Sequence, residues 1–263
     1  MGILNVTPDS FSDGGVHFEA VLAIEAAFRM MDEGADLIDV GGESTRPGSE
    51  GVSADEELKR VIPVIEILAV RGVPISVDTA KAEVAREALN AGAVVVNDVT
   101  AFADPEMAGV CASAGCSVCL MHMKGTPRTM QADPRYEDVV EEVRGFLLGK
   151  ARCAEEAGIP KEHIWIDPGI GFGKTVEHNL TLLKRLDRLV DTGYPVLIGT
   201  SRKSFIGKVL GEKDNPLPAD QRLEGTLATQ IWAQMKGAKV IRAHDVKQSR
   251  RAMDIFAAIS LTL

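Results

Sequence analysis

Short apolar segments alternate with longer amphipathic segments along the whole chain, and this alternation limits the possible folds more than any other feature. Eight of the apolar segments have the length and the β-branched content that are typical of strands. These segments are residues 2–6, 36–40, 73–77, 94–97, 117–121, 164–167, 195–198 and 239–242. They read as apolar on both faces, which is typical of a parallel sheet that helices cover.

The segments between these strands have helical spacing. Two apolar stripes illustrate it: Val21, Ile24, Phe28 and Met31, then Leu58, Val61, Ile65 and Leu68. Ser53 lies three residues before Glu56, and Asp104 precedes Pro105, and both pairs indicate helix starts. An open doubly wound sheet usually has about six strands. Eight strands, each followed by a helix, instead predict a (β/α)8 barrel, a single domain over residues 1–263.

Polar side chains gather where each predicted strand ends. They are Asn5, residues 39–45, Asp78, Asn97, Asp98, His122, Asp167, residues 201–204, Arg242 and His244. Barrel enzymes build their sites at this carboxyl-terminal rim from the loops that follow the strands. The pattern therefore predicts an enzyme that contacts a polar substrate at many points.

Two rim loops carry further signals. The segment 2–15 contains Asn5, whose amide oxygen can bind magnesium or face a phosphate, and Phe11, which is either a lid residue or a core anchor. The segment 41–48 combines glycines, which allow close approach of the backbone, with Arg46. A guanidinium group suits phosphate or carboxylate oxygens. These loops favour an anionic small substrate.

Composition excludes several classes of protein. The formal net charge of −9 argues against a nucleic-acid-binding protein, which needs basic surface. The sequence contains neither a membrane-length apolar run nor a signal peptide, so we expect a cytoplasmic protein. Cys111, Cys116 and Cys119, with Cys153 downstream, have an iron–sulfur spacing, but the first three are expected on a helix, near its end and in a strand. We therefore predict buried, reduced thiols.

A phosphate-binding P-loop is also excluded. Gly173 and Lys174 match the end of that motif, but its first glycine would fall at Pro168.

The two rim loops, together with six further segments, strongly resemble dihydropteroate synthases. The further segments are residues 76–79, 97–98, 120–123, 167–173, 199–205 and 241–245. The resemblance covers nearly the whole chain. It implies a (β/α)8 transferase that condenses 6-hydroxymethyl-7,8-dihydropterin pyrophosphate with p-aminobenzoate and uses Mg²⁺ as a homodimer. The family usually has a short leader before residue 2, so the floor of this barrel is expected to be less covered.

The resemblance also implies roles for individual residues. The pterin residues are Asp78, Asn97, Val99, Met121, Asp167 and Lys203. The pyrophosphate residues are Asn5, Thr45, Arg46, Arg242 and His244, with Asn5 as the metal ligand. The p-aminobenzoate residues are Phe11, Thr45, Pro47, Phe172 and Ser204. Catalytic roles are implied for Asp78, Lys203, Arg46 and Phe11, in an SN1-like loss of pyrophosphate.

Three alternatives stay open at this point. A related pterin-binding module passes a methyl group from a folate to a corrinoid protein, but it does not need segments 44–47 and 201–205. A catalytically inactive barrel that acts as a scaffold is disfavoured because every expected polar position is filled. Asp78 and Asp167 could also merely cap the helices that follow them.

Overall fold

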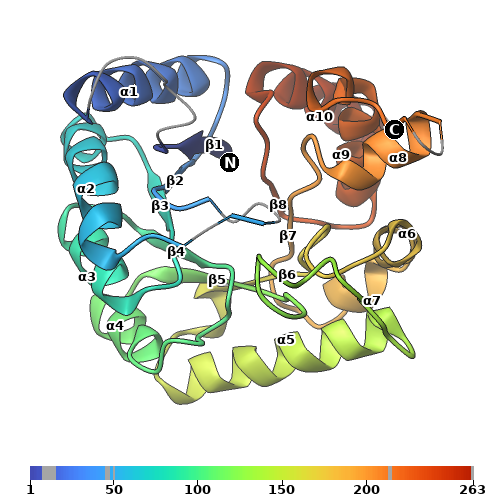
Figure 1. The fold of residues 1–263 in the computed structure, drawn as a ribbon, viewed down its shortest axis with the longest axis horizontal. Helices are drawn as coiled ribbons and strands as arrows, with labels where there is room; N and C mark the ends of the chain where they lie inside the picture. The colour runs from blue at the N-terminus through green and yellow to red at the C-terminus, as the bar shows by residue number, and fades with distance from the viewer. Residues whose placement is uncertain (8–15, 45–47, 50, 213–214, 262–263) are drawn as a thin grey trace.

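Eight parallel strands form the centre of the protein, and helices surround them (Figure 1). The computed structural model describes residues 1–7, 16–44, 48–49, 51–212 and 215–261. The strands are β1 (Gly2–Asn5), β2 (Ile38–Gly41), β3 (Ile75–Asp78), β4 (Val95–Asp98), β5 (Ser117–Met121), β6 (Ile164–Asp167), β7 (Leu197–Ile198) and β8 (Val240–Ile241).

The strands close into a barrel. Strands β1 to β6 pair in sequence order, and β7 pairs with β8. Isolated parallel bridges join the two sheets on both sides, between Ile166 and Val196 and between Gly2 and Ala243. The second junction has two backbone hydrogen bonds, Ile3 N–H to Ala243 O and Ala243 N–H to Met1 O, each 3.0 Å long. The predicted (β/α)8 barrel is confirmed.

The helices form the outer ring in Figure 1. They are α1 (Val16–Asp32), α2 (Ala54–Val70), α3 (Ala82–Asn90), α4 (Met107–Ala114), α5 (Val139–Glu156), α6 (Val176–Lys184), α7 (Asp187–Val190), α8 (Ser204–Leu210), α9 (Leu223–Met235) and α10 (Val246–Leu261). The short helices α7 and α8 are additions to the expected eight among the described residues. In that part of the chain, no helix has both the length and the apolar character needed to cross a bilayer.

One predicted helix start is confirmed and the other is displaced. Ser53 caps α2, because its Oγ accepts a hydrogen bond from the Glu56 N–H at 3.2 Å. Helix α4 begins only at Met107. The Asp104 carboxylate accepts from the Glu106 N–H at 3.0 Å and from the Ala82 N–H at 2.9 Å, so it joins the turn before α4 to the start of α3.

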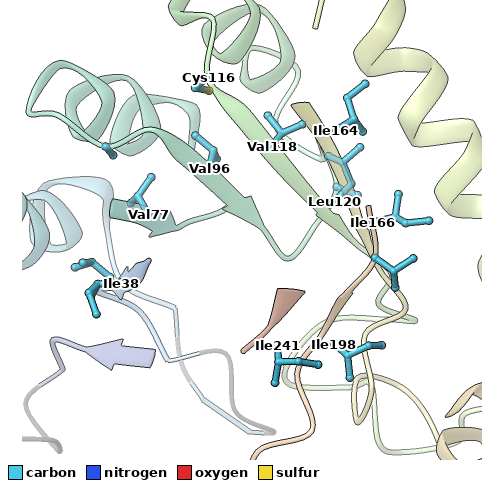
Figure 2. Close-up of a cluster of buried hydrophobic side chains, with 14 of the residues drawn as sticks. Ile38, Val77, Val96, Cys116, Val118, Leu120, Ile164, Ile166, Ile198 and Ile241 are labelled. Atoms are coloured by element: carbon cyan, nitrogen blue, oxygen red, sulfur yellow. The ribbon is translucent and has the colours of Figure 1, made fainter. Parts of the chain in front are cut away.

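The two faces of the strands differ in chemistry. Apolar side chains on one face pack under the helices, and Figure 2 shows Ile38, Val77, Val96, Val118 and Ile164 among them. Neighbouring residues in a strand point to opposite faces, so Asp39, Ser76, Asp78 and Asn97 share the other face, inside the barrel. All four are buried. The expectation that both faces are apolar is therefore wrong for β2, β3 and β4.

Hydrogen-bond register, rather than hydrophobicity, decides where the strands end. Strand β2 extends to Gly41 because Gly41 pairs with Asn5 and Asp78 on either side. The stripe predicted on α2 is confirmed, with Val61 and Leu68 fully buried.

The stripe predicted on α1 is confirmed at Ile24, Phe28 and Met31, which pack partly buried against the core, but not at Val21. Val21 is 52% exposed, whereas Ala23 and Ala27 are fully buried. Short alanine side chains let this helix approach the barrel closely.

The cysteines lie where the periodicity predicts, with one correction. Cys111 lies in α4, Cys116 follows that helix, and Cys119 lies in β5, and all three are buried free thiols. Cys153 is a free thiol but is exposed, so the prediction of burial is wrong for it. A cluster would need a loop wrapped around the metal, and the helix and strand positions do not provide one.

Candidate active site

The centre of the site is a network of four side chains at the carboxyl ends of the strands. Arg242, which follows β8, donates from Nε to Asp39 Oδ2 at 2.6 Å and from Nη2 to Asp78 Oδ2 at 2.8 Å. The Asn97 amide donates to the same oxygen of Asp39 at 3.0 Å. The network therefore joins β2, β3 and β4 to β8 across the barrel.

Burial sets the charge state of this network. It raises the pKa of Asp78 to about 7, an effect that Arg242 opposes and Asp39 reinforces. Burial disfavours the Arg242 cation, but Asp39 and Asp78 outweigh it and raise the pKa of Arg242. The Oδ1 atoms of Asp39 and Asp78 are buried and have no hydrogen-bond partner among the residues that the structure describes. Because native proteins rarely leave buried oxygens unpaired, these atoms mark where a ligand can donate.

Asp167, Phe172 and Lys203 form the opposite part of the site. Burial raises the pKa of Asp167, whose Oδ1 accepts the Gly169 N–H at 2.7 Å. Burial first, and Arg242 second, lower the pKa of Lys203 to about 8, while Asp167 opposes this shift. The Lys203 ammonium lies 3.9 Å from the centre of the Phe172 ring, a distance suited to a cation–π contact.

The loops after β7 and β8 meet through Ser201 and His244. The Ser201 Oγ accepts the His244 backbone N–H at 3.1 Å and lies 3.1 Å from Nδ1 of the same residue. A hydroxyl can donate to Nδ1 or accept from it, and the tautomer of the ring decides which. Burial and Arg242 lower the pKa of His244 to about 4. His244 is therefore neutral near pH 7 and has one ring N–H to donate.

The structure places most of the predicted site residues. The network contains Asp78, Asn97 and Arg242, and the opposite part of the site contains Asp167, Phe172 and Lys203. Asn5 is half-buried at the end of β1, Val99 and Met121 are buried beside their strands, and Ser204 is the exposed first residue of α8. Phe11, Thr45, Arg46 and Pro47 lie outside the described residues.

The helix-capping alternative for the two aspartates is wrong. Helix α3 has Lys81 at its N-cap, and the Asp78 carboxylate instead binds Arg242. Asp167 closes the turn at Gly169, whereas Thr175 caps α6.

Two buried acids had been given no role from the sequence. Asp39 is fully buried in the network, and a charged residue inside an apolar strand was the available signal. Glu57 is fully buried on α2, and Lys81 binds it at 2.6 Å and also binds Glu43. Glu57 lies four residues before Val61, on the same apolar stripe. This ion cluster joins the start of the loop after β2 to α2 and to the loop after β3.

Asn5 remains the candidate metal ligand. In the described part of the chain, no group of three or more His, Cys, Asp or Glu side chains could hold a metal ion. Mg²⁺ commonly keeps several waters and binds phosphate oxygens besides one or two protein ligands. A single amide oxygen at the rim therefore fits an ion that is held chiefly by a pyrophosphate.

Comparisons with known proteins decide the family. The family model described as pterin binding enzyme matches residues 1–244. Dihydropteroate synthase of Escherichia coli (strain K12) is 49% identical over 98% of this chain and 90% of that protein. The chain belongs to the dihydropteroate synthase family of pterin-binding enzymes. The family member of Bacillus subtilis (strain 168) is 48% identical over 98% of this chain and 87% of that protein.

Solved structures of the family have the same fold. Dihydropteroate synthase of Yersinia pestis, in a complex with a sulfonamide drug, has a TM-score of 0.93 at 46% identity, covering 100% of this chain and 94% of that one. The enzyme of Xanthomonas albilineans, in complex with 7,8-dihydropteroate, has a TM-score of 0.89 at 43% identity, covering 100% and 94%.

Proposed function

We propose that this chain, acting as one domain over residues 1–263, condenses 6-hydroxymethyl-7,8-dihydropterin pyrophosphate with p-aminobenzoate to give 7,8-dihydropteroate and pyrophosphate. The observation that carries the proposal is the polar interior of the barrel, where Asp78, Asn97 and Asp167 are buried beside Lys203. A pterin ring presents a row of donors and acceptors, which these carboxylates, amide and ammonium complement. Family membership supports the same reaction.

The pterin would bind between the two parts of the site. The unpartnered Oδ1 of Asp78 is an acceptor for its ring N–H groups, and Lys203 is a donor to its ring acceptors. Loss of pyrophosphate breaks the bond between the methylene carbon and oxygen and leaves a cation that the dihydropterin delocalises. The Asp78 carboxylate, with a pKa of about 7, is partly ionised at neutral pH and stabilises that cation. Val99 and Met121 would supply apolar contacts.

The leaving pyrophosphate would meet cationic and neutral donors at the rim. Arg242 retains its charge, and the neutral His244 ring has one N–H to donate. Mg²⁺, bound through Asn5, would neutralise part of the charge that develops on the pyrophosphate. Thr45 and Arg46 are proposed to complete this site, although they lie outside the described residues.

p-Aminobenzoate would bind beside Phe172, with its carboxylate at the N–H of Ser204 at the start of α8. The first N–H groups of a helix have no partner within the helix, so they suit an anion. The aniline nitrogen then attacks the methylene carbon and loses a proton. Phe11, Thr45 and Pro47 are proposed to complete this pocket and lie outside the described residues.

A coupled assay of pyrophosphate release tests the proposal. Release should require both the pterin pyrophosphate and p-aminobenzoate, and dihydropteroate should accumulate in equal amount. Methyl transfer from a methylated folate to a corrinoid protein, without pyrophosphate release, would establish the methyltransferase alternative.

Asp167→Asn should weaken pterin binding. The substitution removes a buried charged acceptor, and a hydrogen bond to a charged group contributes about 1.5–3 kcal/mol, or roughly ten- to a hundredfold in Kd. Calorimetric titration with the pterin measures it, and Asp187→Asn is the matched control because Asp187 is half exposed and pairs with Lys236. Unchanged binding in a folded Asp167→Asn protein would exclude Asp167 from the pocket.

We also propose that the protein is cytoplasmic, a compartment in which its free thiols would stay reduced.

A homodimer is proposed to form through α9 and α10. Met235 on α9 and Ile255 and Ile259 on α10 are 60%, 64% and 68% exposed, and the two helices are neighbours. Ile255→Asp should convert the dimer to a monomer in sedimentation equilibrium. Val70→Asp, at an 87% exposed position on α2, should leave the dimer intact. A monomeric parent protein would refute the proposal.

A further inference from the structure

The loop between β6 and α6 lies directly on the backbone that follows β5. Gly169 and Gly173 have left-handed φ angles of 67° and 62°. A Cβ atom at Gly169 would lie 1.9 Å from the His122 carbonyl oxygen, and one at Gly173 would lie 2.5 Å from the Lys124 carbonyl oxygen. The loop that carries Phe172 therefore cannot move toward β5, and its position depends on what holds it from the other directions.

Three side chains hold three consecutive carbonyl groups of this loop. Gln131 Nε2 donates to the Gly171 oxygen at 2.6 Å, and Tyr136 Oη donates to the Gly173 oxygen at 2.8 Å. Between them, Lys174 Nζ donates to the Phe172 oxygen at 2.9 Å. We call Gln131, Tyr136 and Lys174 the carbonyl clamp. Gln131 and Tyr136 belong to the loop between β5 and α5, and neither is among the site residues predicted from the sequence.

Lys174 is an unusual choice for such a contact. Lys174 is 3% exposed, and its ammonium lies 3.0 Å from His122 Nδ1 and 3.4 Å from the His122 oxygen. Among the described residues no carboxylate forms an ion pair with it, although Asp167 attracts the charge from farther away. A buried lysine without a direct ion pair is costly. Burial accordingly lowers the pKa of Lys174 to about 7. The buried ammonium thereby joins His122, in the loop after β5, to the backbone of Phe172.

The clamp connects to the site through Phe172. The Phe172 ring lies 3.9 Å from the Lys203 ammonium, so the backbone position of Phe172 also sets where Lys203 lies relative to Asp167. His122, which Lys174 contacts, is itself fixed by the edge-on Phe146 ring at 5.0 Å. A chain of packed groups thus runs from α5 to the substrate side of the barrel.

We propose that the carbonyl clamp positions Phe172 for p-aminobenzoate without touching the substrate. The inference rests on the proposed function for the identity of that substrate. Gln131, Tyr136 and Lys174 are positioning residues, and their loss should affect the second substrate more than the pterin, which binds deeper in the barrel.

Tyr136→Phe removes one clamp hydrogen bond and little else. A single hydrogen bond of this kind should be worth about two- to tenfold in the KM for p-aminobenzoate, with the KM for the pterin changed less than about twofold. Tyr194→Phe is the matched control, because its hydroxyl bonds Glu155 far from the loop. Lys174→Met should raise the KM for p-aminobenzoate more than Tyr136→Phe does, and Lys161→Met is its control. If Lys174→Met does not fold, Tyr136→Phe alone decides.

A double-mutant cycle tests whether the carbonyl clamp acts on p-aminobenzoate through Phe172. In a Phe172→Ala background, Tyr136→Phe should no longer change the KM for p-aminobenzoate, because coupled residues are not additive. Equal rises in both KM values, or an effect that persists without the Phe172 ring, would overturn the proposal.

Amide hydrogen exchange separates this inference from the proposed function. Tyr136→Phe should speed exchange in residues 169–173, while Tyr194→Phe should not. If the unmodified chain makes no dihydropteroate, the proposed function fails, and the exchange result still decides whether the clamp holds the loop. Unchanged exchange in Tyr136→Phe would overturn the clamp.

Discussion

Arg242→Met should destabilise the protein by about 3 kcal/mol and lower kcat/KM by roughly a hundredfold or more, because it leaves buried carboxylates without their cation. Asp39 is fully buried and Asp78 is 8% exposed, and Arg242 donates to both. Urea unfolding measures the loss in the free energy of unfolding, and steady-state kinetics with both substrates measure the loss in kcat/KM.

The loss of stability should depend on pH in a defined direction. Asp78 has a folded pKa of about 7, above its ordinary value of 3.8, so its ionisation costs stability as the pH rises between these values. Removing Arg242 takes away the attraction that opposes this shift, and the pKa of Asp78 rises further. The deficit of Arg242→Met relative to the parent should therefore be larger at about pH 8 than at about pH 6.

Two variants isolate the cause of this deficit. Arg250→Met removes an arginine whose partners, Asp36 and Asp254, are exposed, and should cost less than about 1 kcal/mol. Adding Asp39→Asn to Arg242→Met removes one of the unpaired charges and should recover stability without recovering turnover. A deficit in Arg242→Met that matches that of Arg250→Met would contradict the buried network.

The barrel and its site could be predicted from the sequence because both depend on local patterns. A parallel strand needs a short β-branched run, and its carboxyl end needs a polar residue only where a site is built. Asp78, Asn97 and Asp167 follow both rules, so their place at one rim was predictable. The pairing of Arg242 was not, because it involves Asp39, 203 residues away along the chain. Periodicity contains no information on contacts of that range.

Glu57 and Lys174 show a second limit. Charged residues are almost never fully buried unless paired, so a pattern that assigns charge to the surface misplaces both. Lys81, from the loop after β3, binds Glu57, and His122, from the loop after β5, contacts Lys174. Such burial becomes visible only when the loops are brought together. For Phe11, Thr45, Arg46 and Pro47, which lie outside the described residues, the roles remain predictions.

The polar interior and the clamp have a common physical basis. Buried polar groups cost free energy unless they are paired, and the barrel compensates with an apolar outer face such as Ile38, Val77 and Ile164, each fully buried. Asp78 Oδ1, which has no partner among the described residues, can accept a hydrogen bond from a ligand. That bond would contribute more free energy than the same bond in water. A rigid loop after β6 is needed to keep Lys203 beside Asp167 in such an interior.

Gly169→Ala should therefore be among the most damaging single substitutions in the chain. The left-handed φ of 67° disfavours any residue with a Cβ by about 1–2 kcal/mol, and overpacking against backbone adds about 1–3 kcal/mol. The added Cβ would lie 1.9 Å from the His122 carbonyl oxygen. This backbone has little freedom to move, because the His122 N–H also bonds Asp167 O at 2.9 Å.

Together these two costs should lower the free energy of unfolding, measured in urea, by about 2–5 kcal/mol. Binding of both substrates should also weaken. Gly145→Ala is the matched control, since Gly145 lies in α5, and outside its own stretch of helix no described atom lies within 4 Å of an added Cβ. Alanine there should stabilise the protein by up to about 1 kcal/mol, because it favours the helix. The same substitution should thus have opposite signs at the two sites. A Gly169→Ala protein as stable as the parent would mean that the loop after β6 can relax, and the close approach to His122 would then not constrain Phe172 and Lys203.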